Sequence, residues 1–113
     1  MHELGITQSI VDIAQAHARE QGAQKVLQVR VAIGALSGVM PDAVEFCFES
    51  CSKNTLLEHS RLIIDHIPGQ GRCLQCRADI PLDILTVSCP RCGSLTLETL
   101  AGDELSIQEM EIE

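Results

Sequence analysis

Two Cys-x-x-Cys pairs in the C-terminal half carry the strongest chemical signal in the sequence. Cys73 and Cys76 are followed, after 12 residues, by Cys89 and Cys92, and Gly93 comes directly after the second pair. Two residues between cysteines let both sulfurs of a tight turn face one ion, and two such turns supply the four thiolates of a closed tetrahedral zinc site. Gly93 lets backbone amides turn back toward a ligand sulfur. The pattern predicts a structural zinc ion with no open coordination position.

Other uses of these cysteines remain open from the sequence. A disulfide scaffold is one reading of six cysteines in 113 residues, but no secretory signal is visible, which favours a reduced, cytoplasmic protein. A thioredoxin-like redox motif needs only one pair, at a strand-to-helix junction. Iron is the more serious competitor because tetrahedral thiolates also hold it. Zinc is favoured because it closes the site without redox chemistry, and no feature of the sequence indicates electron transfer.

The first three residues, Met1-His2-Glu3, form a second candidate metal site. A terminal amine, the amide nitrogen of His2 and its imidazole can close fused five- and six-membered rings around one ion, and the amide of Glu3 can add a fourth nitrogen. A planar set of nitrogens suits Ni(II) or Cu(II), whereas zinc prefers a tetrahedron. Cu(II) binds such a set more tightly than Ni(II), so geometry alone does not select nickel. A chance histidine on a frayed terminus is the alternative.

The remaining cysteines and histidines are weaker candidates. Cys47 and Cys51 lie four residues apart among apolar neighbours, so buried core thiols are favoured over a metal pair. His17 falls on the apolar face of a predicted helix and is interpreted as a core residue. His59 and His66 have no cysteine or second histidine at ligand spacing, and neither is favoured as a nickel ligand.

Composition excludes several classes of function. We predict no enzyme, no catalytic residue and no organic cofactor, because no phosphate-binding loop, Ser/His/Asp arrangement or catalytic carboxylate pair is present. Lys and Arg number 8 against 16 Asp and Glu, and Trp and Tyr are missing, which disfavours nucleic acid. No apolar run reaches the roughly 18–20 residues of a membrane helix.

The net charge of −8 suits cations or a partner with a basic face. Acids near the C-terminus are interpreted most simply as solvated surface, with a docking patch for a basic partner as the alternative: Asp103, Glu104, Glu109, Glu111 and Glu113.

Hydrophobic periodicity predicts the elements that must position these residues. Apolar residues at three- and four-residue steps predict a helix over residues 4–21, and strict alternation predicts a strand over 27–33. Pro41 is expected to begin a second helix.

Two further strands are predicted over 61–67 and 105–112. In the second of these strands the alternation of apolar and polar residues shifts by one position between Ile107 and Met110. This shift predicts a β-bulge near Gln108-Glu109.

The two cysteine pairs lie in an insert between Gly69 and Gly102 with few apolar residues. Units of less than about 40 residues rarely fold without a metal or a disulfide. We therefore expect an α+β domain, residues 1–69 plus 103–113, and a zinc-binding module over 70–102. The predicted fold is two helices packed on a small, mainly antiparallel three-stranded sheet, with an inserted zinc-ribbon-like module.

Four segments together resemble one family over essentially the whole chain. They are Met1-His2-Glu3 opening a helix, Val31-Ala32-Ile33-Gly34, Phe46-Cys47-Phe48-Glu49 and the paired Cys-x-x-Cys insert. The sequence resembles the HypA/HybF nickel chaperones of hydrogenase maturation. The resemblance implies a nickel-binding protein that helps load Ni(II) into the [NiFe]-hydrogenase large subunit precursor and receives it from a HypB-type GTPase. Urease accessory proteins are further candidate partners, and a homodimer is a candidate assembly.

The resemblance also implies roles for individual residues. By analogy His2 is the essential nickel ligand, with nitrogens of Met1 and Glu3 beside it, and Asp42 occupies the neighbourhood where some relatives carry an acid that approaches nickel. The zinc cysteines of the family match one for one, as Cys73, Cys76, Cys89 and Cys92. Some relatives flank these cysteines with histidines and this chain does not, which disfavours a zinc site that changes ligands with pH.

Two other functions remain as alternatives. A zinc-ribbon interaction module without nickel transfer is compatible with the insert, but it leaves the larger α+β part unexplained. A thiol oxidoreductase would use one of the Cys-x-x-Cys pairs, and stoichiometric zinc would exclude it because ligated thiolates are not free to cycle.

Overall fold

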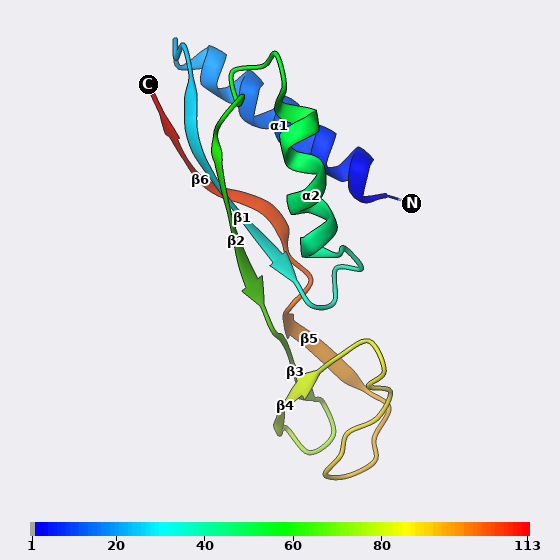
Figure 1. Cartoon of the computed structure of the whole chain (residues 1–113). Coiled ribbons are helices and arrows are strands. Elements are labelled where there is room, and N and C mark those ends of the chain that lie inside the picture. The colour runs from blue at the N-terminus through cyan, green and yellow to red at the C-terminus, as the bar shows by residue number, and fades with distance from the viewer. Residues whose placement is uncertain (1) are drawn as a thin grey trace.

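The computed structural model describes residues 2–113, so the part of the nickel-site prediction that falls on Met1 lies outside the described residues. The chain folds into two lobes along an axis of 54 Å, the longest of its three dimensions (Figure 1). The elements are α1 (Glu3–Glu20), β1 (Val26–Gly34), α2 (Pro41–Ser52), β2 (Arg61–Ile67), β3 (Gly69–Cys73), β4 (Asp79–Leu82), β5 (Leu97–Ala101) and β6 (Leu105–Ile112).

The larger lobe contains α1, α2 and a three-stranded sheet in the order β2-β1-β6. Because α2 connects β1 to β2, the chain crosses over and these two strands run parallel, with Val31 opposite Ile64. β6 joins the other side of β1 in the antiparallel direction. A second sheet, β4-β3-β5, is wholly antiparallel and forms the smaller lobe.

The main core lies between the two helices and the first sheet. β1 is the central strand and is largely buried, whereas α1 and α2 each contribute one face. As predicted from its spacing, Cys51 is buried in this core, and burial raises the pKa of its thiol. The core consists of Ile10, Val11, Ala14, Ala18, Val26, Val29, Val31, Ile33, Val44, Phe48, Cys51 and Leu57.

One prediction about this core is wrong. His17 was expected among the core residues, but it is exposed, and Ile13 beside it on α1 keeps 61% of its surface accessible. The sheet ends at β6, so the helix face that carries these two residues extends past the last strand. Both residues line a surface hollow beside that strand.

The predicted bulge in the last strand is confirmed. Arg30 of β1 pairs with Glu109, but the next residue, Val31, pairs with Ile107, so Gln108 has no partner in the ladder. The extra residue shifts the side-chain alternation by one position. Ile107 and Met110 can therefore both pack against the core although they are three residues apart.

The two lobes meet where backbone segments approach very closely. The amide of Leu36 donates a hydrogen bond to the carbonyl of Gly102 (2.6 Å), and the amide of Gly34 donates one to the carbonyl of Glu104 (2.8 Å). A Cβ on Gly34 would overlap the Gly102 carbonyl, and one on Gly102 would overlap Gly69. Gly102 also has a φ of 109°, which side-chain-bearing residues rarely adopt. Glycine is therefore required at this junction.

The predicted α+β class with an inserted cysteine-bearing unit is confirmed. Among the described strand pairs, three are antiparallel and only β1–β2 is parallel. None of the helices described between residues 2 and 113 combines the length and apolar character needed to cross a bilayer.

Candidate metal centres

The four predicted zinc cysteines come together in the smaller lobe. Their Sγ atoms all lie within 4.8 Å of one another, and all four are free thiols. The Sγ–Sγ distance is 3.5 Å between Cys73 and Cys92 and 3.7 Å between Cys76 and Cys89. Zinc–sulfur bonds of about 2.3 Å in a tetrahedron place sulfurs about 3.8 Å apart. The cluster is therefore consistent with a structural zinc site.

The same turn is built twice around this cluster. In each turn the first cysteine is buried and the second is exposed, and a residue with positive φ follows the pair: Arg77 (65°) or Gly93 (77°). An amide inside each turn points at the first sulfur, from Cys76 to Cys73 and from Arg91 to Cys89, both at 3.4 Å. The matching backbone bonds are Arg77 to Cys73 (2.8 Å), Cys73 to Ala78 (2.9 Å), Gly93 to Cys89 (2.8 Å) and Cys89 to Ser94 (2.8 Å), each from N–H to C=O.

The turns change the acidity of the thiols unequally. The amide of Cys76 lowers the pKa of Cys73 to about 6, and the amide of Cys92 lowers the pKa of Cys89. A hydrogen bond from the amide of Ser94 acts to lower the pKa of Cys92. The Cys92 thiol also forms hydrogen bonds with neighbouring sulfurs, of which that of Cys73 has the largest effect, and the pKa of Cys92 is raised to about 12. Four thiolates at this spacing repel one another, and a dication removes the conflict because it stabilises all four.

The second candidate site lies at the start of α1, in the larger lobe (Figure 1). His2 is exposed at the N-cap position; its carbonyl accepts the amide of Ile6 (2.8 Å), and its side chain makes no capping bond. The ring borders a hollow of about 510 Å³ that also reaches Ser9, Ile13 and Leu105. The imidazole is therefore accessible and is not needed to cap the helix.

Glu3 is hydrogen-bonded to the residue that precedes α2. Its Oε2 accepts a hydrogen bond from the amide of Met40 (3.3 Å), and its carbonyl accepts one from the hydroxyl of Thr7 (2.6 Å). The pKa of the Glu3 carboxyl is lowered, first by its own amide and then by that of Met40. As the first residue of α1, Glu3 has an amide with no acceptor within the helix.

Other candidates from the sequence are placed elsewhere. Asp42 borders a hollow shared with Met40 and His66, and His2 does not line that hollow. Among the described residues, the four cysteines make up the one group of three or more possible ligands within reach of a common ion. His17, His59 and His66 are outside it.

Sequence reasoning missed two features of these sites. The left-handed backbone of Arg77 repeats the role of Gly93, but arginine gives no composition signal for positive φ. The bond between Glu3 and Met40 joins residues far apart in sequence, so local patterns do not indicate it.

Comparison with known proteins gives a consistent result over the full length. The family described as "Hydrogenase/urease nickel incorporation, metallochaperone, hypA" matches residues 1–112. The chain is 46% identical to "Hydrogenase maturation factor HypA" of Geobacter metallireducens, over 113 residues and 100% of both chains. It is 50% identical to the protein of that name from Nostoc punctiforme, covering 100% of this chain and 96% of that one.

Solved structures show the same fold. The "Solution structure of the Ni metallochaperone HypA from Helicobacter pylori" matches with a TM-score of 0.68 at 24% identity, over 99% of this chain and 97% of that one. The "Solution structure of HypA protein" matches with a TM-score of 0.72 at 23% identity, over 100% and 97%. With the family match and the relatives above, these likenesses place the chain in the HypA family of nickel-incorporation metallochaperones for hydrogenase maturation.

Proposed function

We propose that this chain binds Ni(II) through the first residues of α1 and delivers it to the [NiFe]-hydrogenase large subunit precursor. The carrying observation is the exposed His2 imidazole at the helix N-cap, directly before the amide of Glu3. A Met1 with a free amine would complete a planar set of nitrogens from the amine, two amides and the imidazole. A family role in nickel incorporation supports nickel as the ion carried.

The helix start suits this chemistry because its first amides are not used in the helix. The first four N–H groups of an α-helix have no acceptor within it, so a metal can replace an amide proton there without breaking a helical hydrogen bond. The positive end of the helix dipole repels a free cation. Loss of two amide protons on binding supplies two negative charges, and these balance the charge of Ni(II).

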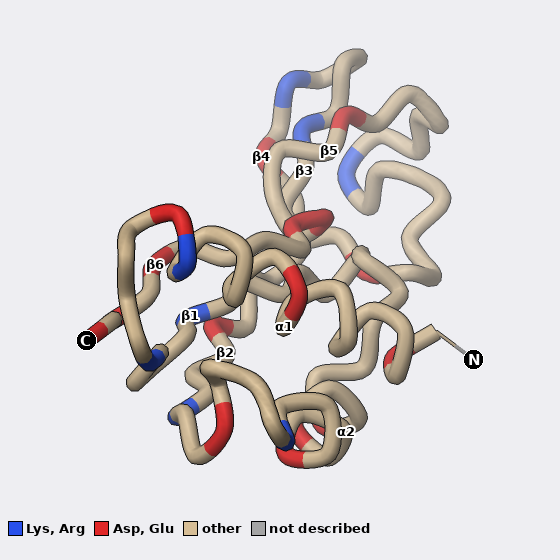
Figure 2. Tube along the Cα trace, turned by 90° about the horizontal axis from the view of Figure 1, so that it is seen from above, with Lys and Arg blue, Asp and Glu red and all other residues tan. Residues whose placement is uncertain are grey.

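Accessibility supports a delivery function. Ligands on an exposed helix end can exchange metal with a partner's ligands inside a complex, without opening the core. The net charge of −8 attracts cations and lies entirely outside residues 70–102, where three basic and three acidic residues cancel (Figure 2). By analogy with the family, the source is a HypB-type GTPase and the recipient is the hydrogenase precursor.

The cysteine cluster has a structural role in this proposal. Residues 70–102 would form a zinc-dependent unit inserted into an α+β unit of residues 1–69 and 103–113. The small cluster of Cys73, Cys89 and Ile80 gives the smaller lobe little apolar core. Zinc binding would therefore supply most of its folding free energy. No ligand exchange or catalysis is assigned to this ion.

A Ni(II) titration of untagged protein, followed by absorbance and magnetism, tests the proposal. A planar nitrogen site is yellow and diamagnetic, whereas an octahedral site of side-chain ligands is pale and paramagnetic. The His2→Ala variant should lose nickel binding and keep one zinc per chain. His66→Gln, which changes another exposed histidine, should bind nickel like the parent. Nickel bound equally by His2→Ala, or found among the thiols, would disprove the assignment.

A further inference from the structure

The larger sheet ends at β6, and one edge of this strand has no neighbouring strand among the described residues. The order β2-β1-β6 gives β6 a single partner over its eight residues. An edge strand presents backbone N–H and C=O groups that another extended chain can pair with. β2 is the opposite edge of the same sheet and serves below as an internal comparison.

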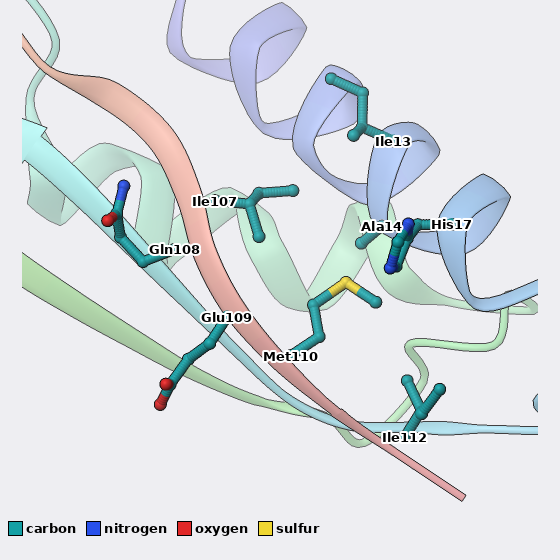
Figure 3. A pocket seen from close by; sticks show the side chains of 8 residues that line it. All are labelled: Ile13, Ala14, His17, Ile107, Gln108, Glu109, Met110 and Ile112. Atoms are coloured by element: carbon teal, nitrogen blue, oxygen red, sulfur yellow. The ribbon is translucent and has the colours of Figure 1, made fainter. Parts of the chain in front are cut away.

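A hollow runs beside this edge, between β6 and α1. It has a volume of about 320 Å³, and Figure 3 shows Ile13 and His17 of α1 facing Ile107 and Met110 of β6 across it. The bulge at Gln108 is the reason that both apolar residues of β6 point into the hollow. Gln108 and Glu109 also belong to the lining, although their side chains extend from the strand on the side away from α1 in Figure 3.

The hollow continues toward the helix N-terminus. Ile13 also lines the hollow of about 510 Å³ that contains His2 and Leu105. The two hollows together follow β6 from Leu105, its first residue, to Ile112, its last. Their apolar lining includes Ile13, which keeps 61% of its surface exposed.

The other face of β6 is acidic. After the bulge, side chains alternate, so Glu109, Glu111 and Glu113 lie opposite the face that carries Met110 and Ile112. Arg30 of β1 pairs with Glu109 at 3.2 Å, and among the described residues neither Glu111 nor Glu113 forms an ion pair. Opposite charges on neighbouring strands stabilise pairing, and like charges weaken it.

We propose that β6 and α1 form a docking groove for an extended peptide segment of a partner protein, in which apolar residues alternate with lysine or arginine. The segment adds a fourth strand to β6, places its apolar side chains in the hollow beneath Ile13 and His17, and sets its basic side chains beside Glu109 and Glu111. Backbone hydrogen bonds give affinity, and the alternate pockets and charges give specificity.

Charge argues against a second copy of this chain as the occupant. Two β6 strands paired edge to edge would bring two rows of glutamates together on the same face, which destabilises the pair. The groove ends at the hollow that contains His2, so a docked partner segment would lie next to the proposed nickel ligands. Docking itself does not depend on nickel binding.

The test uses zinc-loaded full-length protein without nickel and a fluorescent eight-residue peptide of alternating lysine and leucine or valine. Fluorescence polarisation should show it binding at least about fivefold more tightly than a peptide of identical composition with four lysines followed by four apolar residues. In hydrogen exchange, amides of β6 should gain protection and amides of β2 should not. A glutamate-for-lysine peptide should not bind.

Backbone pairing is tested by methylating the peptide nitrogens. Two peptides are compared, each methylated at every second amide. Methylation of the amides that face β6 should abolish binding, and methylation of the amides that face away from β6 should leave binding nearly unchanged. Equal affinity of the two methylated peptides would overturn the proposal. So would protection at β2, or β6 protection that appears without peptide as protein concentration rises, because a second copy would then occupy the edge.

Variants of exposed residues complete the test. Ile13→Lys should reduce binding at least about tenfold, because a charge enters the groove, whereas Leu4→Lys, on α1 outside both hollows, should not. Glu111→Lys should weaken binding about threefold or more, and Glu45→Lys on α2 should not. Because the assay contains no nickel, its outcome is separate from that of the proposed nickel site. Unchanged binding by both Ile13→Lys and Glu111→Lys would refute the groove.

Discussion

The backbone amide of Met40 donates a hydrogen bond to Oε2 of Glu3, with 3.3 Å between nitrogen and oxygen. Met40 is the residue that precedes α2, and Glu3 is the first residue of α1. This contact holds the start of one helix against the start of the other. Glu3, whose amide is one of the proposed nickel ligands, is therefore tied to the segment before α2.

The first prediction concerns the Glu3 carboxylate. Because the planar nitrogen site uses the amide of Glu3 and not its side chain, Glu3→Gln should bind one Ni(II) with the same diamagnetic spectrum as the parent. Loss of that spectrum would show that the carboxylate is itself a ligand. The same variant should show a weaker dependence of stability on acid pH.

The sign of that pH dependence follows from the lowered pKa of Glu3. A carboxyl with a lower pKa in the folded state than in the unfolded state contributes stability above its unfolded pKa and loses it as pH falls through the folded pKa. Thermal unfolding midpoints should therefore fall with acid pH more steeply for the parent than for Glu3→Gln. Parallel curves for the two proteins would contradict this.

The second prediction concerns the chain terminus. A short N-terminal extension or an acetyl group should abolish planar nickel binding, because either removes the amine from the proposed ligand set. Binding by the unblocked chain should release two amide protons per nickel, plus the proton carried by the protonated fraction of the terminal amine at the working pH, and should strengthen steeply as pH rises. Isothermal titration in buffers of different ionisation enthalpy counts the protons, and a tagged chain with unchanged affinity would count against the site.

The third prediction concerns zinc. Cys76→Ser, or removal of the metal by a chelator, should unfold the smaller lobe and leave the larger lobe folded, because the larger lobe has its own apolar core. Hydrogen exchange should then accelerate in β3–β5 and change little in β1. As a control, Cys47→Ser alters a thiol outside the cluster and should keep one zinc per chain. Equal exchange throughout both lobes would show that they do not fold separately.

The fourth prediction concerns the junction between the lobes. Gly102→Val should destabilise the protein by roughly 2 kcal/mol or more, because a side chain at φ 109° is strained and would overlap Gly69. Gly5→Ala, where open space surrounds the added carbon, should cause no loss. Urea unfolding of the two variants gives the comparison. An unaffected Gly102→Val would mean that the junction can rearrange.

The sequence alone determined the elements and the ligand types. Hydrophobic spacing gave the two strands over 61–67 and 105–112 with the bounds they have in the structure, and the parity shift between Ile107 and Met110 located the bulge. These predictions succeeded because strand periodicity and helix starts are local properties. The metal-ligating role of the Cys-x-x-Cys pairs was also predicted from the sequence, because the spacing within each turn fixes which sulfurs can face one ion.

Tertiary structure decided what depends on contacts between distant segments. β1 and β2 run parallel because α2 crosses over between them. The glycines at 34 and 102 are required only where the two lobes bring their backbones together, and glycine is required at 69 because a Cβ there would overlap the carbonyl of Leu82 in β4. His17 has the spacing of a core residue, yet it is exposed because the sheet ends at β6 before reaching it. Helical periodicity tells which residues share a face, but the extent of the surface packed against that face is set by the whole fold.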